Sequence, residues 1–342
     1  DASFGKTYLF KEDFKATYGG FLIRILFNDK LINNEFFFQF SRSNMYWSQA
    51  NNLVGGGAQP QFNANVIANL IVPCPSLSEQ SAIAKILSDL DFRIELNQQM
   101  NKTLEEISKA IFKHWFIDFE FPNGKGKPYK SSGGEMVDSE FGKIPKGWKV
   151  GKLEDLGKIQ PGYAFKSEDF QKEGYGLIKI RNIDKSGSVN LDFESYISKE
   201  LFNNTNKRFN LNSGDVVIAM TGAELGKVGI LPKYENNLLL NQRVGKVVSD
   251  YKYIIYLWLK SNYFQSIMGG TSSASSAQGN ISNSDIENIE IIVPNKDILK
   301  LFNQVINSLY NKLVEDSGEN ILLAQIRDSL LPKLMSGKIR VP

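Results

Sequence analysis

The chain has 342 residues, of which 42% are hydrophobic, as is typical of about two soluble domains with cores of their own. Its 40 basic and 37 acidic residues leave a net charge of only +3, so charge alone does not indicate a nucleic-acid binder. A single cysteine, Cys74, excludes an internal disulfide framework and suits a reducing cytoplasm, and no run reaches the roughly 18 apolar residues of a membrane span.

Residues 1–75 are predicted to form a mixed α/β domain. The run Phe21–Phe27 has the composition of a strand, and Asn34–Tyr46 carries a short aromatic-rich helix. A glycine-rich loop at 55–57 leads to a last strand at Leu70–Val72.

Residues 76–121 are predicted to form a long helix. Ser76 and Glu79 fit a capping box at its start, and Pro75 and Pro122 bracket it. Apolar residues recur along it in steps of three and four, as in a coiled-coil seam: Ile83, Leu87, Leu90, Ile94, Leu104 and Ile111.

The composition changes at residues 122–143, where glycine, serine and lysine are typical of a linker, and a hinge is expected there. A second mixed domain is predicted for residues 144–294. It carries a helix at Tyr253–Leu259 and a Ser/Gly/Asn-rich loop at Gly269–Asn280. Its strand-like runs are Leu177–Ile180, Val216–Met220, Val228–Leu231, Val244–Val248 and Glu290–Val293.

Residues 295–342 carry a second long helix that repeats the first. An offset of 219 residues carries those six seam positions of the first helix and Ile107 onto seven apolar residues: Phe302, Ile306, Leu309, Leu313, Leu323, Ile326 and Leu330. The chain therefore consists of two copies of a domain followed by a long helix. The segment Phe4–Lys6 matches Leu225–Lys227 of the second copy. In the second copy, residues 144–224 come before this point, so the first copy is expected to lack its N-terminal half.

Both seams are polar near their middles. The repeated polar positions are Asn97 with Asp316, Asn101 with Asn320 and Ser108 with Arg327. If the helices pair antiparallel, the central polar layers meet and fix the register at a cost in stability. The alternative is that these residues turn to solvent around Gly318.

The reactive side chains argue against catalysis. One histidine, His114, and one cysteine cannot make a zinc cluster, and a nucleophile-base pair would depend on His114 alone. The turn Gly222–Lys227 has one residue too few for a phosphate-binding loop and is followed by Val228 where serine or threonine must bind magnesium. No glycine-rich dinucleotide-binding loop follows a strand, so no cofactor of its own is expected.

Three segments resemble the DNA specificity subunit of type I restriction-modification systems: Ile71–Asp91, Ile144–Val150 and Leu330–Gly337. The similarity spans almost the whole chain. It implies an α+β fold with two pseudo-repeated α/β target-recognition domains, joined by two long helices that form an antiparallel coiled coil. The implied parts are a first recognition domain at 1–75, a helix at 76–121, a linker at 122–143, a second recognition domain at 144–294, and a second helix with a tail at 295–342.

The resemblance also implies a function and partners. In that family each recognition domain reads half of a split DNA sequence, the helices set the distance between the halves, and the subunit is not an enzyme. The implied partners are double-stranded DNA, two methyltransferase subunits and a restriction/translocase subunit. S-adenosylmethionine, ATP and magnesium would belong to those subunits, and the chain would carry no metal and act in the cytoplasm, away from membranes.

Candidate DNA contacts are chosen as polar and basic side chains in loops, because base edges and phosphates are bound by such groups. In the second domain they are Gln160, Tyr163, Lys166, Arg181, Asn182, Thr221, Lys227, Gln242, Arg243, Thr271, Gln278 and Asn280. In the first domain they are Lys6, Arg24, Gln59 and Gln61. Each has an alternative as a turn or rim residue.

A cluster of aromatic residues at the end of the first helix is predicted to bind a partner subunit: Phe112, Trp115, Phe116 and Phe119, with Phe121 beside them. The alternative is that they pack against the adjacent recognition domain. Two other functions stay open: the recognition part of a fused restriction-methylation enzyme, and a coiled-coil assembly protein without DNA affinity.

Overall fold

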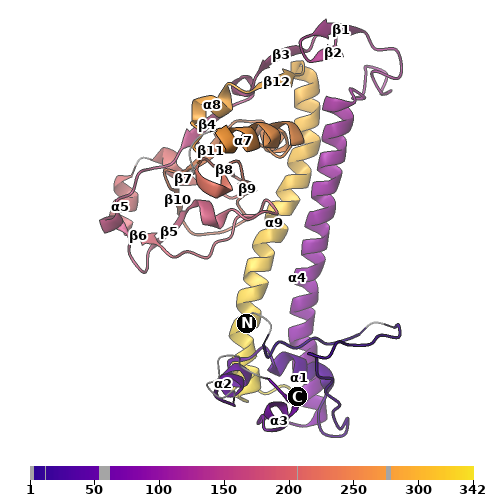
Figure 1. Cartoon of the computed structure of the whole chain (residues 1–342), viewed down its shortest axis with the longest axis vertical. Coiled ribbons are helices and arrows are strands. Elements are labelled where there is room, and N and C mark those ends of the chain that lie inside the picture. The colour runs from indigo at the N-terminus through magenta and orange to yellow at the C-terminus, as the bar shows by residue number, and fades with distance from the viewer. Residues whose placement is uncertain (1–3, 12, 54–61, 206, 275–278) are drawn as a thin grey trace. The chain divides into compact units, whose positions relative to one another are not determined.

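The structure is a computed structural model that describes residues 4–11, 13–53, 62–205, 207–274 and 279–342. The chain divides into two compact units. Unit 1 comprises Asp1–Asn97 and Asn320–Pro342, and unit 2 comprises Gln98–Glu319. The two long helices, α4 (Leu77–Phe112) and α9 (Lys296–Met335), each contribute a segment to both units (Figure 1).

The described residues of unit 1 include three short helices in addition to its segments of α4 and α9. They are α1 (Asn34–Phe40), α2 (Asn44–Leu53) and α3 (Ala64–Ala68) (Figure 1). The side chain of Asn33 caps α1 by accepting hydrogen bonds from two backbone amides of its first turn. The core joins apolar faces of all these helices except α3, and its buried members include Phe36, Phe40, Tyr46, Ile83, Leu87, Leu331 and Leu334.

The two strands predicted in the first domain are wrong. Neither Phe21–Phe27 nor Leu70–Val72 is a strand, and no described residue of unit 1 belongs to one. The apolar run at Phe21–Phe27 has no neighbouring strand to pair with, and the side chain of Phe21 is fully exposed. The predicted glycine-rich loop at 55–57 lies outside the described residues.

The first long helix is confirmed, with different details at both ends. Ser76 Oγ accepts a hydrogen bond from Glu79 N at 3.2 Å, so half of the predicted capping box forms. The Glu79 carboxylate instead accepts from the guanidinium of Arg340 at 2.6 and 2.7 Å, and these hydrogen bonds hold the pKa of Glu79 below its usual range. At the other end α4 passes into a π-helical turn at Lys113–Ile117.

Within its described residues, unit 2 contains four sheets and four further α-helices. The strands are β1 (Met136–Ser139), β2 (Gly142–Pro145), β3 (Lys149–Lys152), β4 (Lys158–Pro161), β5 (Tyr175–Ile178), β6 (Tyr196–Ile197), β7 (Asn210–Leu211), β8 (Val216–Ala219), β9 (Val228–Ile230), β10 (Leu238–Leu240), β11 (Val244–Val248) and β12 (Glu290–Val293). The helices are α5 (Lys199–Asn204), α6 (Lys252–Leu259), α7 (Asn262–Ala274) and α8 (Asn283–Glu287).

Two four-stranded sheets form the body of unit 2. Their strand orders are β4-β11-β8-β9 and β6-β5-β10-β7, and the only parallel neighbours in these two sheets, β5 and β10, pair Gly176 with Leu238. Apolar residues of both sheets share one core cluster, which includes Ile178, Val217, Leu238, Leu240 and Val244. This cluster covers one face of each sheet, and the strands β8, β9 and β10 are buried along their whole length.

All five strands predicted for the second domain are present as β5, β8, β9, β11 and β12, and the helix at Tyr253–Leu259 is α6. The loop predicted from Gly269 is partly wrong, because α7 continues to Ala274. Residues 275–278 lie outside the described part of the chain.

Residues 122–143, expected to be a linker, contain packed structure. β1 and β2 form an antiparallel hairpin. Just before this segment, the buried ring of Phe121 stacks on Tyr129 and Trp148, with centroid distances of 4.5 and 4.9 Å. The glycines and serines of this stretch therefore occupy turns beside an aromatic core.

In each unit the segments of α4 and α9 run side by side in opposite directions (Figure 1). In unit 1, Asn97 Nδ2 donates to Asn320 Oδ1 at 3.0 Å. In unit 2, Asn101 Nδ2 donates to Ser317 Oγ at 3.1 Å. The antiparallel pairing and the meeting of polar layers are confirmed, and the solvent-facing alternative is wrong because Asn97 and Asp316 are each only 1% exposed.

Gly318 lies in α9 where a loop of unit 2 comes close. A Cβ atom at this position would lie 2.6 Å from both the Cβ and the carbonyl oxygen of Lys233, whose amide donates to Val314 O at 3.0 Å. Glycine to alanine normally stabilises a helix interior by about 1 kcal/mol. We expect Gly318→Ala to destabilise unit 2 instead, by about 1–3 kcal/mol, because the loop must shift. Chemical denaturation followed by tryptophan fluorescence measures this, and an increase in stability would contradict it.

Candidate nucleic-acid interface

One end of the sheet β4-β11-β8-β9 gathers residues that are far apart in sequence. Neighbouring strands are antiparallel, so β4 and β8 end where β9 and β11 begin. This places Tyr163, Thr221, Lys227 and Arg243 at one edge. Backbone hydrogen bonds tie the loops together: Tyr163 N donates to Leu240 O at 2.8 Å, and Met220 N donates to Arg243 O at 3.1 Å.

The second sheet adds residues to the same edge. β5 and β10 are parallel and end together, and Asn241 N donates to Ile178 O at 3.1 Å. The turn after β5 carries Lys179 and Arg181. Asn280 also belongs here through a bridge to Thr221. We call this set the sheet-end surface: Tyr163, Lys179, Arg181, Thr221, Lys227, Gln242, Arg243 and Asn280.

The cations of the sheet-end surface differ in their partners. Arg243 is exposed and has no acidic partner among the residues that the structure describes. Arg181 forms an ion pair with Glu194, and Lys227 forms one with Glu224. Tyr163 is 37% exposed and packs edge-on against Phe165 and Phe209, so its ring is held at the rim.

Lys179 was missed by the sequence reasoning. Its Nζ donates to Ser195 Oγ at 2.8 Å and lies 4.1 Å from the centroid of the Phe170 ring. Burial, followed by the neighbouring charge of Arg181, lowers the pKa of Lys179 below its ordinary value. Its position one residue beyond a buried strand was the signal that could have identified it.

Two predicted residues are engaged by the protein itself. Asn182 is 2% exposed, and its amide donates to the carbonyl oxygens of Asn190 and Asp192 while its oxygen accepts from Lys179 N. It stabilises the turn and is not offered to a ligand, which corrects its assignment. Gln160 lies in β4, and its Nε2 donates to Arg208 O at 2.6 Å.

The remaining predicted residues lie elsewhere. Lys166 is exposed beside Glu168, and Lys6 and Arg24 are exposed in unit 1. Thr271 lies in α7, and its side chain is outside the described atoms. Gln59, Gln61 and Gln278 lie outside the described residues.

The predicted aromatic partner surface is buried instead. Phe112, Phe116 and Phe119 are 5%, 0% and 8% exposed and belong to the main core of unit 2, against which the partly buried Trp115 packs. The Phe116 ring lies 4.6 Å from that of Phe302 and 5.7 Å from that of Trp148. These rings thus pack against the adjacent domain, as the alternative predicted, and Phe112, Phe116 and Phe119 are covered by this chain itself.

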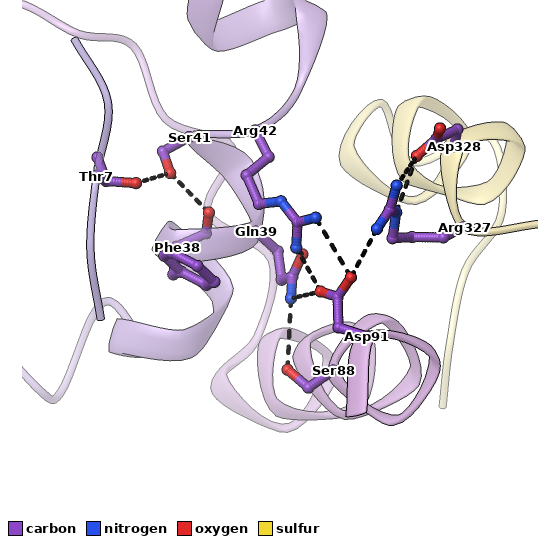
Figure 2. Close-up of polar contacts among 9 residues, drawn as sticks. All are labelled: Thr7, Phe38, Gln39, Ser41, Arg42, Ser88, Asp91, Arg327 and Asp328. Carbon is purple, nitrogen blue, oxygen red and sulfur yellow. Dashed lines mark hydrogen bonds and ion pairs between the residues drawn. The ribbon is translucent and has the colours of Figure 1, made fainter. Parts of the chain in front are cut away.

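A polar cluster in unit 1 joins three helices (Figure 2). The Asp91 carboxylate of α4 accepts hydrogen bonds from Gln39, in the last turn of α1, and from Arg42, just after α1. It also accepts one from Arg327 of α9 at 2.9 Å. Burial acts to raise the pKa of Asp91, but the two guanidinium groups outweigh it and hold that pKa below its usual range. Asp328 is the other partner of Arg327 (Figure 2).

The described residues contain no cluster of acidic, histidine or cysteine side chains that could hold a metal ion. No helix within the described residues is long and apolar enough to span a membrane.

Comparisons with known proteins point to one family. The family model described as "Type I restriction modification DNA specificity domain" matches residues 1–106 and 145–317. The MjaIX specificity subunit of a type I restriction enzyme from Methanocaldococcus jannaschii is 30% identical over 84% of the chain. The corresponding HindI subunit from Haemophilus influenzae is 26% identical over 83% of the chain, which covers 72% of that protein.

The chain spans 65% of the length of the MjaIX subunit. Its fold is similar to the crystal structure of a type I restriction-modification S subunit from M. genitalium, with a TM-score of 0.56 and 15% identity; the match covers 89% of this chain and 73% of that one. With its paired long helices and its β-sheets, the chain belongs to the type I restriction-modification DNA specificity family.

Proposed function

We propose that the chain is a non-catalytic reader of DNA sequence that directs methylation and cleavage by partner subunits. The observation that carries this proposal is the sheet-end surface of unit 2. It brings four cationic side chains together with the polar side chains of Thr221, Gln242 and Asn280. Such a mixture suits a duplex, because cations bind phosphates while arginine, glutamine and asparagine read base edges.

Arg243 is the proposed base-reading residue. It precedes β11, its backbone carbonyl is held by Met220 N, and its side chain is exposed without an acidic partner among the described residues. An arginine whose backbone is fixed in this way can make two parallel hydrogen bonds from its guanidinium to the edge of a guanine. Lys179, Arg181 and Lys227 would then bind flanking phosphates.

The target is proposed to be bipartite. The internal repeat provides a second, partial copy of the recognition element, residues 1–75, in which Lys6 and Arg24 are the exposed candidate contacts. Two readers on a helical spacer contact DNA at a separation set by that spacer. We propose the boundaries 1–75, 76–121, 122–143, 144–294 and 295–342 for the two readers, two helices and linker.

The proposed partners are two methyltransferase subunits and a restriction/translocase subunit, in a cytoplasmic complex with double-stranded DNA. These subunits would supply S-adenosylmethionine, ATP and magnesium chemistry. The likeness to specificity subunits supports this assignment.

Selection of bound duplexes from a random DNA library, using the chain with its cognate methyltransferase subunit, tests the proposal. Two enriched blocks at a fixed gap are the expected result. One block alone would limit reading to unit 2 and contradict the bipartite target. No enrichment would contradict DNA reading and favour a coiled-coil assembly protein.

Replacing Arg243 with alanine tests the surface directly. We expect binding of the selected duplex to weaken by about 1–3 kcal/mol, roughly 5-fold to 150-fold, with discrimination lost at one base position. Lys146→Ala is the control, because Lys146 is an exposed cationic residue that directly follows β2 and pairs with Glu135 at 2.8 Å. Equal effects of the two substitutions in a fluorescence-anisotropy titration would contradict the assignment.

A further inference from the structure

We infer that Glu194 and Glu224 are specificity-determining residues, which neutralise Arg181 and Lys227 so that only the correct DNA sequence engages these cations fully. The inference rests on the proposed function. It adds that two carboxylates of the chain compete with the DNA phosphates for these two cations. Both carboxylates lie in loops of the sheet-end surface and pair with cations that face the same ligand.

The Glu224–Lys227 pair is built into the tight turn between β8 and β9. Lys227 N donates to Glu224 O at 3.1 Å, and the carboxylate of Glu224 pairs with the Lys227 ammonium three residues on. Gly226 holds this turn at φ +80°, where a side chain would be strained and would meet Met268. The backbone therefore presents the two side chains to each other before any DNA arrives.

The Glu194–Arg181 pair joins two loops of the other sheet. β6 pairs antiparallel with β5, so the residues before β6 lie beside the residues after β5. Glu194 thereby meets Arg181, and the adjacent Ser195 meets Lys179. Arg181 Nη2 also donates to Asp192 O at 3.3 Å, so both terminal nitrogens of the guanidinium contact this loop.

Arg243 differs from Arg181 and Lys227, because no carboxylate among the described residues pairs with it. The surface thus holds two cations without a carboxylate partner among the described residues, Arg243 and Lys179, and two compensated cations, Arg181 and Lys227. In both of these ion pairs the carboxylate is the more exposed partner, at 69% for Glu194 and 41% for Glu224, so solvent or a phosphate can replace it.

Displacement of a carboxylate by a phosphate exchanges one ion pair for another and gains little free energy. Non-specific binding depends almost entirely on phosphate contacts and counterion release, so this exchange penalises it most. A cognate duplex adds base contacts, which can drive the displacement. The carboxylates act as repulsive elements against wrong sequences, one of the two routes to specificity.

Isosteric Glu224→Gln and Glu194→Gln substitutions test this in the full chain with its methyltransferase subunit. Each is expected to tighten binding of a random-sequence duplex roughly threefold to tenfold, and to steepen the log–log salt slope by about 0.9. Binding of the selected duplex should tighten less, so the specificity ratio falls. The readout is fluorescence anisotropy between about 50 and 200 mM salt.

Glu135→Gln is the matched control, because it removes the same charge from an exposed ion pair with Lys146 outside the surface. The Glu224→Gln effect should also largely disappear in a Lys227→Gln background. Equal tightening by Glu135→Gln, or an unchanged specificity ratio with intact DNA binding, would overturn the inference. Absence of sequence-selective binding by the unsubstituted chain would instead overturn the proposed function.

Discussion

Phe302→Ala is expected to destabilise unit 2 by about 3–5 kcal/mol, which shifts its melting temperature by on the order of 10 °C. Phe302 is fully buried, and its ring lies 5.3 Å from that of Trp115 and 4.6 Å from that of Phe116. Truncation leaves a cavity among aromatic rings that cannot all collapse into it. Because the cluster joins the end of α4 to α9, the loss should be felt across unit 2.

Tryptophan fluorescence during chemical denaturation measures this loss, since three of the four tryptophans, Trp115, Trp148 and Trp258, belong to unit 2. Phe92→Ala is the control, because Phe92 is a phenylalanine of α4 that is 66% exposed. It should change the free energy of unfolding by at most about 0.5 kcal/mol. Similar losses in the two variants would contradict the assignment of the aromatic cluster as core.

Asp91→Asn is expected to destabilise unit 1 by about 2 kcal/mol at neutral pH. It removes the charge that holds Arg42 of the α1 end and Arg327 of α9 (Figure 2). Breaking a fully buried ion pair costs about 3–5 kcal/mol, and the Asp91 side chain is 26% exposed, so solvent screening reduces the figure. Hydrogen exchange of the α1 amides provides a local readout.

The effect of Asp91 should depend on pH. Its pKa is lower in the folded protein than in the unfolded chain, so its contribution to stability is full above the unfolded value of about 3.9. The contribution is lost as the pH falls through the folded pKa, and the two proteins should then converge. Asp89→Asn, on an exposed pair with Lys85 in the same helix, should have little effect at any pH. A stability difference that is independent of pH would contradict the role of the carboxylate.

The features predicted correctly are those that depend on neighbours in sequence. The apolar period of α4 and α9 indicates helices because side chains three and four residues apart share a helical face. The 219-residue offset between the seams then indicates two helices of one kind, and their repeated polar positions do meet, as Asn97 with Asn320 shows. The β-branched runs of unit 2 indicate strands that the sheets do contain.

The strand predicted at Phe21–Phe27 failed for a reason that no local pattern reveals. A strand is stable only when another strand satisfies its backbone hydrogen bonds, and unit 1 offers none among its described residues. The aromatic residues after α4 were misjudged for a related reason. An aromatic side chain such as Phe116 is expected to be buried, either by a partner subunit or by the chain itself. Only the packing of Trp148 and Phe302 against its ring shows that this chain buries it.

For the interface, the residue types came from the sequence and their grouping came from the fold. Tyr163, Lys227 and Arg243 were separate candidates until the antiparallel order of β4, β11, β8 and β9 placed them at one edge. Asn182 has the same chemistry as a base reader, yet its turn uses all of its hydrogen-bonding groups.

By itself the sequence determined the repeat and the two long helices, because these depend on periodicity. Only the tertiary structure decided which cations of the surface are compensated, because Glu194 meets Arg181 through the pairing of β6 with β5, a contact between strands that local pattern does not encode.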